Sequence, residues 1–201
     1  MAAYICYSNP AGRRLHPKPP KRKAEKSQID DAMPSVRVAL TADADAIFSL
    51  VNAAYHAETG DVPPAFKATT RFIAHSEILP SIAAGRVLLL CGEGDGAPLG
   101  CLSYTLERGA AAGAPLRAHF GPFAVAPGAQ GRGVGSALLA ELAAHARAAG
   151  CVSLDAEVVN HRHDIFEMYL GLGFRVVGEG AFPAHERCTR PCHFVCIRRP
   201  V

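Results

Sequence analysis

The strongest constraint on the fold is a glycine-rich loop that stands between an apolar strand and a helix. The strand is expected over His119–Val125, and the loop Gln-Gly-Arg-Gly-Val-Gly follows at residues 130–135. Apolar residues then recur at helical spacing from Val134 to Ala149, and Gly150 stands where a terminating glycine belongs. Glycines let successive N–H groups turn inward, and a helix start adds its own unsatisfied N–H groups. The sequence therefore predicts a phosphate or pyrophosphate site, with Arg132 as a charge at its rim.

Two common classes of phosphate-binding protein fit this loop poorly. A phosphate-loop NTPase needs Lys and then Ser or Thr after the final glycine, whereas Ser136 and Ala137 follow here. A dinucleotide-binding fold needs Gly-x-Gly-x-x-Gly, but these glycines stand at 131, 133 and 135. A tight strand–helix connection that binds nothing stays open as the structural alternative.

Strands and helices alternate through the rest of the chain. Alternating or short apolar runs predict strands, and apolar residues at helical spacing predict helices. Strands are expected at 36–39, 86–91, 99–106, 152–159, 174–177 and 193–197, and helices between 41 and 55, within 66–84 and at 164–170. Thr41 is expected to cap the first of these helices, and Pro80 to break the second. This order predicts an α/β (α+β) fold, in which helices pack on a mixed sheet that includes antiparallel hairpins.

Composition divides the chain near residue 35. Residues 1–24 contain six Lys or Arg residues and no acidic one, and prolines interrupt the segment as far as Pro34. Such a segment buries too little apolar area to fold, so we expect a disordered basic tail at 1–35 and one domain at 36–201. The whole chain has a formal charge of only +3, so the domain itself is mildly acidic. That balance does not favour a nucleic-acid partner.

The apolar runs and the cysteines indicate in which cellular compartment the protein resides. Runs such as 87–91 are too short to cross a bilayer, so no membrane partner is expected. The cysteine count of seven is odd, no secretory signal pattern is visible, and several cysteines stand in apolar strands. These features favour a reducing, cytoplasmic location. The basic tail leaves a nuclear or organellar address open, since Pro20-Lys21-Arg22-Lys23 is typical of a nuclear import signal.

Two segments resemble the signatures of the GNAT superfamily of N-acetyltransferases. The run Phe123–Leu139 contains Gln/Arg-x-x-Gly-x-Gly/Ala, filled by Gln130, Gly133 and Gly135. Downstream, Tyr169–Phe174 is similar to the superfamily's Tyr-x-x-x-Gly-Phe. The resemblance covers roughly residues 36–199 and implies the acyl-CoA N-acyltransferase fold: a mixed, mostly antiparallel central sheet with a splayed strand pair, flanked by helices on both faces.

The resemblance implies acetyl-CoA as the cosubstrate and no metal. The pantetheine arm would lie between the strands 119–125 and 152–159 and contact the backbone of Phe123, Ala124 and Val125. The pyrophosphate would be held by Gln130, Gly131, Arg132, Gly133, Val134, Gly135 and Ser136.

The resemblance also assigns catalytic roles, in a direct attack of a bound amine within a ternary complex. Tyr169 stands at the position of the proton donor to the departing thiolate. Glu157 is the first choice for the general base, with His119, His56, Glu58 or a chain of waters as alternatives. Many relatives have Asn seven residues before the tyrosine, where this chain has Arg162, and the role of Asn160 stays open.

The acceptor is expected to be a primary amine of a small molecule, bound by residues 41–84 and 180–199. The alternatives are a protein lysine or N-terminus, and a non-catalytic acetyl-CoA-binding module. Edge strands at the C-terminal end would allow a homodimer. Zinc at Cys188, Cys192, His193 and Cys196 is a further alternative, but we expect free cysteines, since no Cys-x-x-Cys pair is present.

Overall fold

The computed structural model describes residues 35–56, 73–92, 96–183 and 185–201. Apart from residue 35, the expected tail at 1–35 lies outside the described residues. The helices are α1 (Ala44–His56), α2 (His75–Ala83), α3 (Val134–Ala148) and α4 (His163–Gly171). The strands are β1 (Val36–Val38), β2 (Val87–Cys91), β3 (Pro98–Arg108), β4 (Leu116–Val125), β5 (Ser153–Val159), β6 (Arg175–Ala181) and β7 (His193–Pro200). None of the described helices is long and apolar enough to span a membrane.

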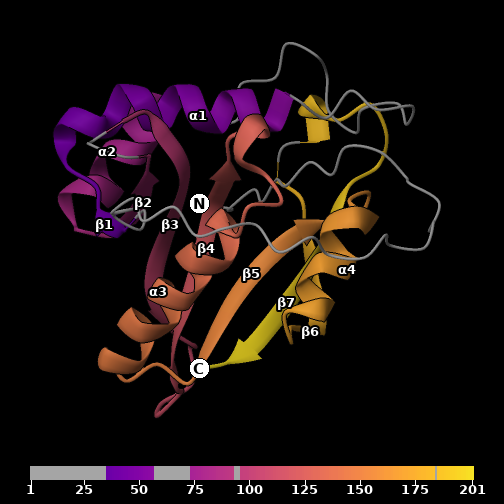
Figure 1. Cartoon of the computed structure of the whole chain (residues 1–201). Coiled ribbons are helices and arrows are strands. Elements are labelled where there is room, and N and C mark those ends of the chain that lie inside the picture. Colours follow the sequence, from indigo (N-terminus) through magenta and orange to yellow (C-terminus); the bar gives the residue numbers. More distant parts are fainter. Residues whose placement is uncertain (1–34, 57–72, 93–95, 184) are drawn as a thin grey trace, which may run out of the picture.

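The strands form one seven-stranded sheet in the order β1-β2-β3-β4-β5-β7-β6. The β4–β5 pair is parallel, and the other pairs recorded for the described strands are antiparallel. This arrangement confirms the expected mixed, mostly antiparallel sheet. The parallel pair lies in the middle of the strand order, with α3 as the connection between its two strands (Figure 1).

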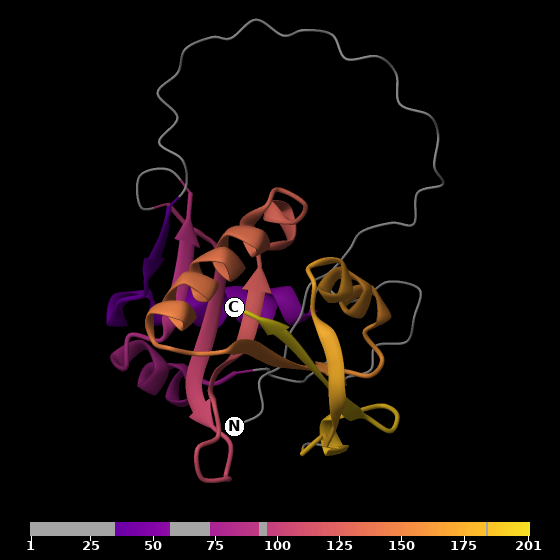
Figure 2. The same cartoon turned by 90° about the horizontal axis from the view of Figure 1, so that it is seen from below.

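Helices cover both faces of the sheet, with α1 and α2 on one face and α3 and α4 on the other (Figures 1 and 2). Successive side chains of β2 point to opposite faces of the sheet and so pack in two different cores. Leu88 and Leu90 pack in the core that includes α3 and α4, whereas Val87 and Leu89 pack in the core that includes α1 and α2. Because β2 is buried on both faces, its sequence Val-Leu-Leu-Leu-Cys is apolar throughout.

A β-bulge in β4 separates the parallel pair. Phe123 faces Leu102 and Phe120 faces Tyr104, so two residues of β4, at 121 and 122, oppose the single Ser103 of β3. The β4–β5 register pairs are Ala118 with Leu154 and His119 with Asp155, directly before the bulge. A bulge bends its strand and increases the local twist. Beyond His119 the two strands diverge, which gives the splayed pair that the resemblance implied.

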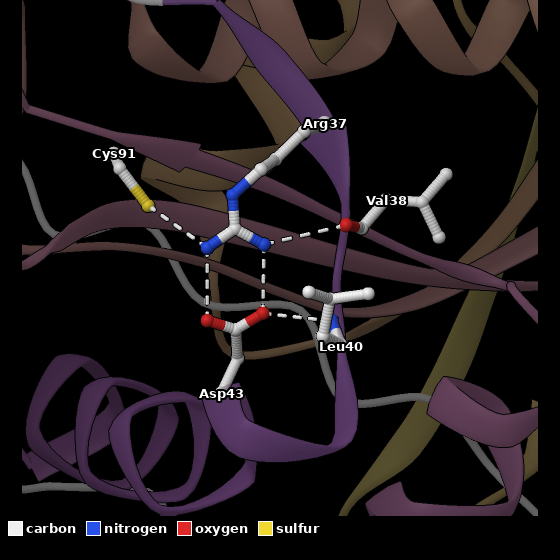
Figure 3. Close-up of polar contacts among 5 residues, drawn as sticks. All are labelled: Arg37, Val38, Leu40, Asp43 and Cys91. Atoms are coloured by element: carbon white, nitrogen blue, oxygen red, sulfur yellow. Dashed lines mark hydrogen bonds and ion pairs between the residues drawn. The ribbon is translucent and has the colours of Figure 1, made fainter. Parts of the chain in front are cut away.

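Two local expectations were wrong. Thr41 does not cap α1: it begins a short turn of 3-10 helix at residues 41–43. The carboxylate of Asp43 instead accepts the N–H of Leu40 at 2.7 Å and both terminal nitrogens of Arg37 at 2.7 and 2.9 Å (Figure 3). Pro80 lies within α2 and does not end it, and the carbonyl of Pro80 still accepts the N–H of Ala84 at 3.0 Å.

Candidate functional site

The glycine loop has the left-handed backbone that its sequence predicts. Gly131 has φ of +72° and Gly133 has φ of +86°, and Gly133 is the residue that precedes the first turn of α3. A Cβ atom at either position would have no neighbour within 4 Å. Glycine is therefore required here by the backbone conformation and not by lack of space.

The predicted loop residues divide into anchors and exposed groups. Gln130 donates its side-chain N–H to the carbonyl of Val125 at 3.3 Å, which ties the loop to the end of β4. Val134 and Gly135 are buried, whereas Gly131, Arg132, Gly133 and Ser136 are exposed. The exposed members surround the start of a fifteen-residue helix. They have the donors that a pyrophosphate needs: unencumbered backbone N–H groups, a hydroxyl and a guanidinium.

A close approach between β3 and α3 positions this loop. A Cβ atom on Gly100 would lie 2.6 Å from Cγ1 of Val134 and 3.0 Å from Cδ1 of Leu138. Glycine at position 100 therefore lets the first turn of α3 rest directly on the sheet. Gly100 was not among the predicted site residues, although a lone glycine inside a strand pattern is a signal of close approach.

The free backbone edge of β4 faces the gap between β4 and β5. The N–H of Ala126 donates to the carbonyl of Leu99 at 2.9 Å, and in an antiparallel pair such bonded positions alternate. The backbone of Ala124 therefore points toward β3, whereas that of Phe123 and Val125 points toward the gap. All three side chains of 123–125 are fully buried, so a ligand in the gap would contact backbone groups. The alternation favours Phe123 and Val125 over Ala124 for this contact.

Tyr169 lies beside the point where β4 and β5 diverge. It is on α4, it is fully buried, and its ring centroid is 6.1 Å from that of Phe120 and 5.1 Å from that of Phe174. Phe120 directly follows His119, the last residue of β4 with a partner on β5. The fold thus brings Tyr169 to the apex of the gap from the α4 side. Its role as proton donor stays a prediction.

Glu157 lies on β5 but its carboxylate leans away from β4. Its Cα faces that of Cys196 on β7. Its Oε1 lies 3.7 Å from the position that a Cβ on Gly180 of β6 would occupy. The pKa of the Cys196 thiol is raised, first by burial and then by the nearby charge of Glu157. Because its carboxylate lies beside β6, a side-chain rotation is needed before the carboxylate can face the gap.

His119 is the alternative base that the structure places at the apex of the gap. It is half-buried, and its register partner on β5 is Asp155. Asp155 accepts hydrogen bonds from Nε of Arg198 at 2.9 Å and from the hydroxyl of Ser153 at 2.7 Å. Burial is the largest single influence and raises the pKa of Asp155, but these hydrogen bonds and the charges of Arg198 and Arg117 together lower it by more, so the carboxylate is held ionised. This ion pair was not predicted from the sequence, because its two partners are far apart along the chain and meet only when β5 pairs with β7.

The two remaining base candidates lie outside what the structure describes. His56 is the last residue of α1, but its side chain is not among the described ones, and neither is Glu58. Asn160, whose role the sequence left open, links β5 to β7: its side-chain oxygen accepts the N–H of His193 at 3.2 Å.

The cysteines bear on metal binding and on reactivity. Within the described residues, no group of three or more His, Cys, Asp or Glu side chains is placed to hold a metal ion. Cys192 and Cys196 are free thiols, and Cys188 is half-buried. Burial raises the pKa of Cys101 to about 12, so this thiol stays protonated and acts as a packing residue.

Comparisons with known proteins agree with this geometry. Residues 50–174 match the model of the acetyltransferase (GNAT) family. A ribosomal-protein-alanine N-acetyltransferase from Brucella melitensis superimposes with a TM-score of 0.62 and 22% identity, over 83% of this chain and 99% of that one. A Salmonella typhimurium protein solved with its cofactor acetyl-CoA gives a TM-score of 0.61 and 21% identity, over 84% and 94%.

A third solved structure contains a peptide. The NatC complex bound to Gag peptide and CoA includes a chain that superimposes with a TM-score of 0.59 and 13% identity, over 79% of this chain and 91% of that one. At these identities the superpositions establish the fold alone. The comparison with curated proteins found no match.

Proposed function

Because the chain belongs to the acetyltransferase (GNAT) family, we propose that it transfers an acetyl group from acetyl-CoA to a primary amine of a small molecule. The observation that carries this proposal is the coincidence of two features. A left-handed glycine loop opens onto the start of α3, and the strand before it turns a free backbone edge toward the β4–β5 gap. The first feature suits a pyrophosphate, and the second suits the amides of a pantetheine arm.

Acetyl-CoA, when bound, supplies a thioester carbonyl as the electrophile. In our proposal the exposed N–H groups of the loop hold the pyrophosphate, and Gln130 keeps the loop closed against the carbonyl of Val125. The N–H of Val125 points into the gap, where it can donate to a carbonyl oxygen as negative charge develops there. Phe123 offers its backbone groups one pleat further along β4.

Three proton transfers complete the chemistry: the ammonium loses one proton before attack, the departing sulfur gains one as the carbon–sulfur bond breaks, and the nitrogen of the new amide loses its second proton, which restores the donor. The acceptor ammonium must lose a proton before its nitrogen can attack, and Glu157 is the proposed base, with His119 as its alternative. The phenolic oxygen of Tyr169 is the proposed donor of the proton that the departing sulfur takes up. The reference pKa values of phenol and thiol are close enough for that transfer.

A second acceptor class is favoured by a specific finding. Two of the solved structures are named for work on peptides or proteins: the Brucella ribosomal-protein-alanine N-acetyltransferase and the NatC complex with Gag peptide. A protein N-terminus or lysine is therefore the second candidate. The third reading, a non-catalytic acetyl-CoA-binding module, would keep the loop but show no amine-dependent turnover.

One experiment separates these readings. The purified full chain is titrated calorimetrically with acetyl-CoA, and thiol release is then followed with polyamines, aminoglycosides, amino acids and Lys or N-terminal peptides. We expect binding, and release that depends on a small amine. Release with peptides alone would select the protein acceptor, and binding without release would select the module. No binding would refute the proposal.

Location and assembly are part of the same proposal. We place the protein in the cytoplasm, or in the nucleus or an organelle if residues 1–35 are an address, and we propose a homodimer. Fluorescent fusions with and without residues 1–35 test the address. Sedimentation at several protein concentrations tests the dimer, and a concentration-independent monomer would contradict it.

A further inference from the structure

Glu157 and the glycine loop lie on opposite faces of the sheet. Val159 on β5 and Phe194 on β7 pack in the core that includes α1 and α2. Side chains two residues apart on a strand share a face, so Glu157 and Cys196 point to that same face. The loop instead leads into α3, which covers the other face (Figures 1 and 2). A cofactor at the loop and an acceptor beside Glu157 would therefore reach the β4–β5 gap from opposite faces.

The carboxylate of Glu157 is available to a ligand. Within the part of the chain that the structure describes, its side chain forms no ion pair and no hydrogen bond. Asp155, on the same face of β5, is by contrast bonded to Arg198 and Ser153. Glu157 is half-buried, and its charge, after burial as the first cause, raises the pKa of the neighbouring Cys196 thiol. A partly buried carboxylate of this kind is stabilised when a cation binds to it.

Strand β6 leaves open space beside this carboxylate. Gly178 and Gly180 have register partners on β7 whose side chains point to the face of Glu157. A Cβ atom on Gly180 would lie 3.7 Å from Oε1 of Glu157 and 3.6 Å from Sγ of Cys196. A longer side chain at this position would therefore fill the space around the carboxylate. Because β6 is the last strand of the sheet and Gly178 is exposed, a ligand can reach the carboxylate from this edge.

The carboxylate stands at a distance from the gap. In the strand order β4-β5-β7-β6 it lies beside β6, whereas the gap is on the other side of β5. With neighbouring strands about 4.8 Å apart, the carboxylate is roughly 8–12 Å from the middle of the gap. An ammonium held there cannot also be the reacting group, but a second amino group of the same molecule can reach the gap. An extended chain of about five carbons between two nitrogens spans roughly this distance when the hydrogen bond to the carboxylate is included.

His119 lies on the same face and beside the gap. Its neighbours Ala118 and Phe120 pack in the core that includes α3 and α4, so its side chain points to the face of Glu157. It is also the last residue of β4 with a partner on β5. In the orientation that the structure shows, Glu157 can therefore bind a distal ammonium while His119 takes the proton of the reacting one.

We propose that the acceptor is an aliphatic diamine, whose distal ammonium binds to Glu157 while its other amino group lies in the β4–β5 gap. Gly180 is then a specificity-determining residue, because its lack of a side chain leaves the carboxylate accessible. The inference rests on the proposed acetyl transfer and names its acceptor class. The free amino nitrogen forms the bond to the carbonyl carbon and the carbon–sulfur bond breaks. The three proton transfers are those of the proposed function, with His119 as the base.

The test compares cadaverine, an unbranched diamine of five carbons, with pentylamine, which has the same chain and lacks the second ammonium. Thiol release by the purified full chain gives kcat/KM for each amine. We expect the wild type to prefer the diamine by about tenfold, as one charge-assisted contact gives. Gly180→Val, which fills the space beside the carboxylate, should bring this ratio close to one. Glu157→Gln should do the same, because it removes the charge that holds the distal ammonium.

The ratio separates this role of Glu157 from the role of a base. Loss of a base would lower kcat/KM for both amines and leave the ratio unchanged. Gly178→Val is the matched control, since it adds the same side chain to the same strand where a Cβ atom meets nothing within 4 Å. It should keep the wild-type ratio. Urea unfolding of both valine variants shows that each is folded.

The outcomes stay distinct. Equal kcat/KM for the two amines in the wild type, or a preference that survives Glu157→Gln, would overturn the diamine inference and leave acetyl transfer in place. Release with peptides but with neither amine would overturn it in the same way. A preference lost equally in Gly178→Val would attribute the effect to the strand and overturn the role of Gly180. Failure of every acceptor to release thiol would overturn the proposed function as well.

Discussion

Gly133 and Gly113 have similar positive φ angles but lie in very different places in the fold. Their φ angles are +86° and +77°, and a Cβ atom on either would have no neighbour within 4 Å. Gly133 precedes α3 at the proposed pyrophosphate site, whereas Gly113 lies in the connection between β3 and β4. Any difference between substitutions at the two positions therefore reports on the ligand and not on strain.

We expect Gly133→Asp to weaken acetyl-CoA binding by on the order of 100-fold, because a carboxylate would stand against the phosphates. Gly113→Asp should lower the free energy of unfolding by about 1 kcal/mol, as Gly133→Asp does, and leave the acetyl-CoA affinity unchanged. Calorimetric titration gives the affinities, and urea unfolding gives the stabilities. Equal affinities for the two variants would remove the glycine loop from the binding site.

Tyr169 and Tyr104 are buried tyrosines whose side chains belong to the same core. Tyr169 lies at the apex of the β4–β5 gap, whereas the hydroxyl of Tyr104 is 3.2 Å from Nδ1 of His145 on α3. We expect Tyr169→Phe to lower kcat by about 100-fold, as loss of a general acid does, with little change in acetyl-CoA affinity. Tyr104→Phe should leave kcat within about twofold of wild type. Similar rates for both variants would exclude the phenol of Tyr169 from the mechanism.

At the scale of elements, the contact between β3 and α3 sets the position of the loop. Gly100→Ala would place a Cβ atom 2.6 Å from Val134, so the first turn of α3 must move away from the sheet. We expect a loss of about 1–3 kcal/mol in the free energy of unfolding and weaker acetyl-CoA binding. Gly92→Ala, where nothing lies within 4 Å, is the matched control and should be neutral. Unfolding and titration measurements check both variants, and an unchanged Gly100→Ala protein would contradict the close packing.

Helices and strands with a strong local period were predicted from the sequence, whereas features that depend on strand pairing were not. Helices α3 and α4 and the strands around them were predicted within a few residues, because each has a strong local period. The bulge in β4 was not predicted. It depends on the register between β3 and β4, and that register is set by long-range packing. The direction of the Glu157 side chain could not be predicted for the same reason, because its neighbours come from β6 and β7.

For the whole molecule, two ion pairs stabilise separate parts of the sheet. Asp43, in the turn that follows, bonds Arg37 on the edge strand β1, and Asp155 on β5 bonds Arg198 on the neighbouring strand β7. Hydrogen bonding to Arg37 is the main cause that lowers the pKa of Asp43. At Asp155 burial raises the pKa, but the hydrogen bonds from Arg198 and Ser153 and the charges of Arg198 and Arg117 together lower it by more. A carboxyl whose folded pKa is lowered stabilises the fold above its unfolded value, near 3.8, and loses this effect as the pH falls through the folded pKa.

We therefore expect Asp43→Asn and Asp155→Asn each to reduce the free energy of unfolding by about 1 kcal/mol at pH 7. Because three strands separate the two sites in the sheet order, the two losses should add. Both differences from wild type should shrink as the pH falls below about 4. Asp45→Asn is the control: its carboxylate is 93% exposed and lies 3.3 Å from Nδ1 of His75, so we expect a much smaller loss at pH 7 than at the two buried sites. Losses that persist unchanged at pH 3 would show that the charges are not responsible.

The sequence by itself determined the glycine loop, its place between a strand and a helix, and the tyrosine on α4, because each of these is written in consecutive residues with a local period or conformation. Only the tertiary structure decided that β4 and β5 diverge after His119, that Phe123 and Val125 turn their backbones to the gap, and that the carboxylate of Glu157 lies beside Gly180. These features depend on strand register, on a bulge and on contacts between segments far apart in the chain. Such contacts are fixed by packing of the whole domain, which no short stretch of residues encodes.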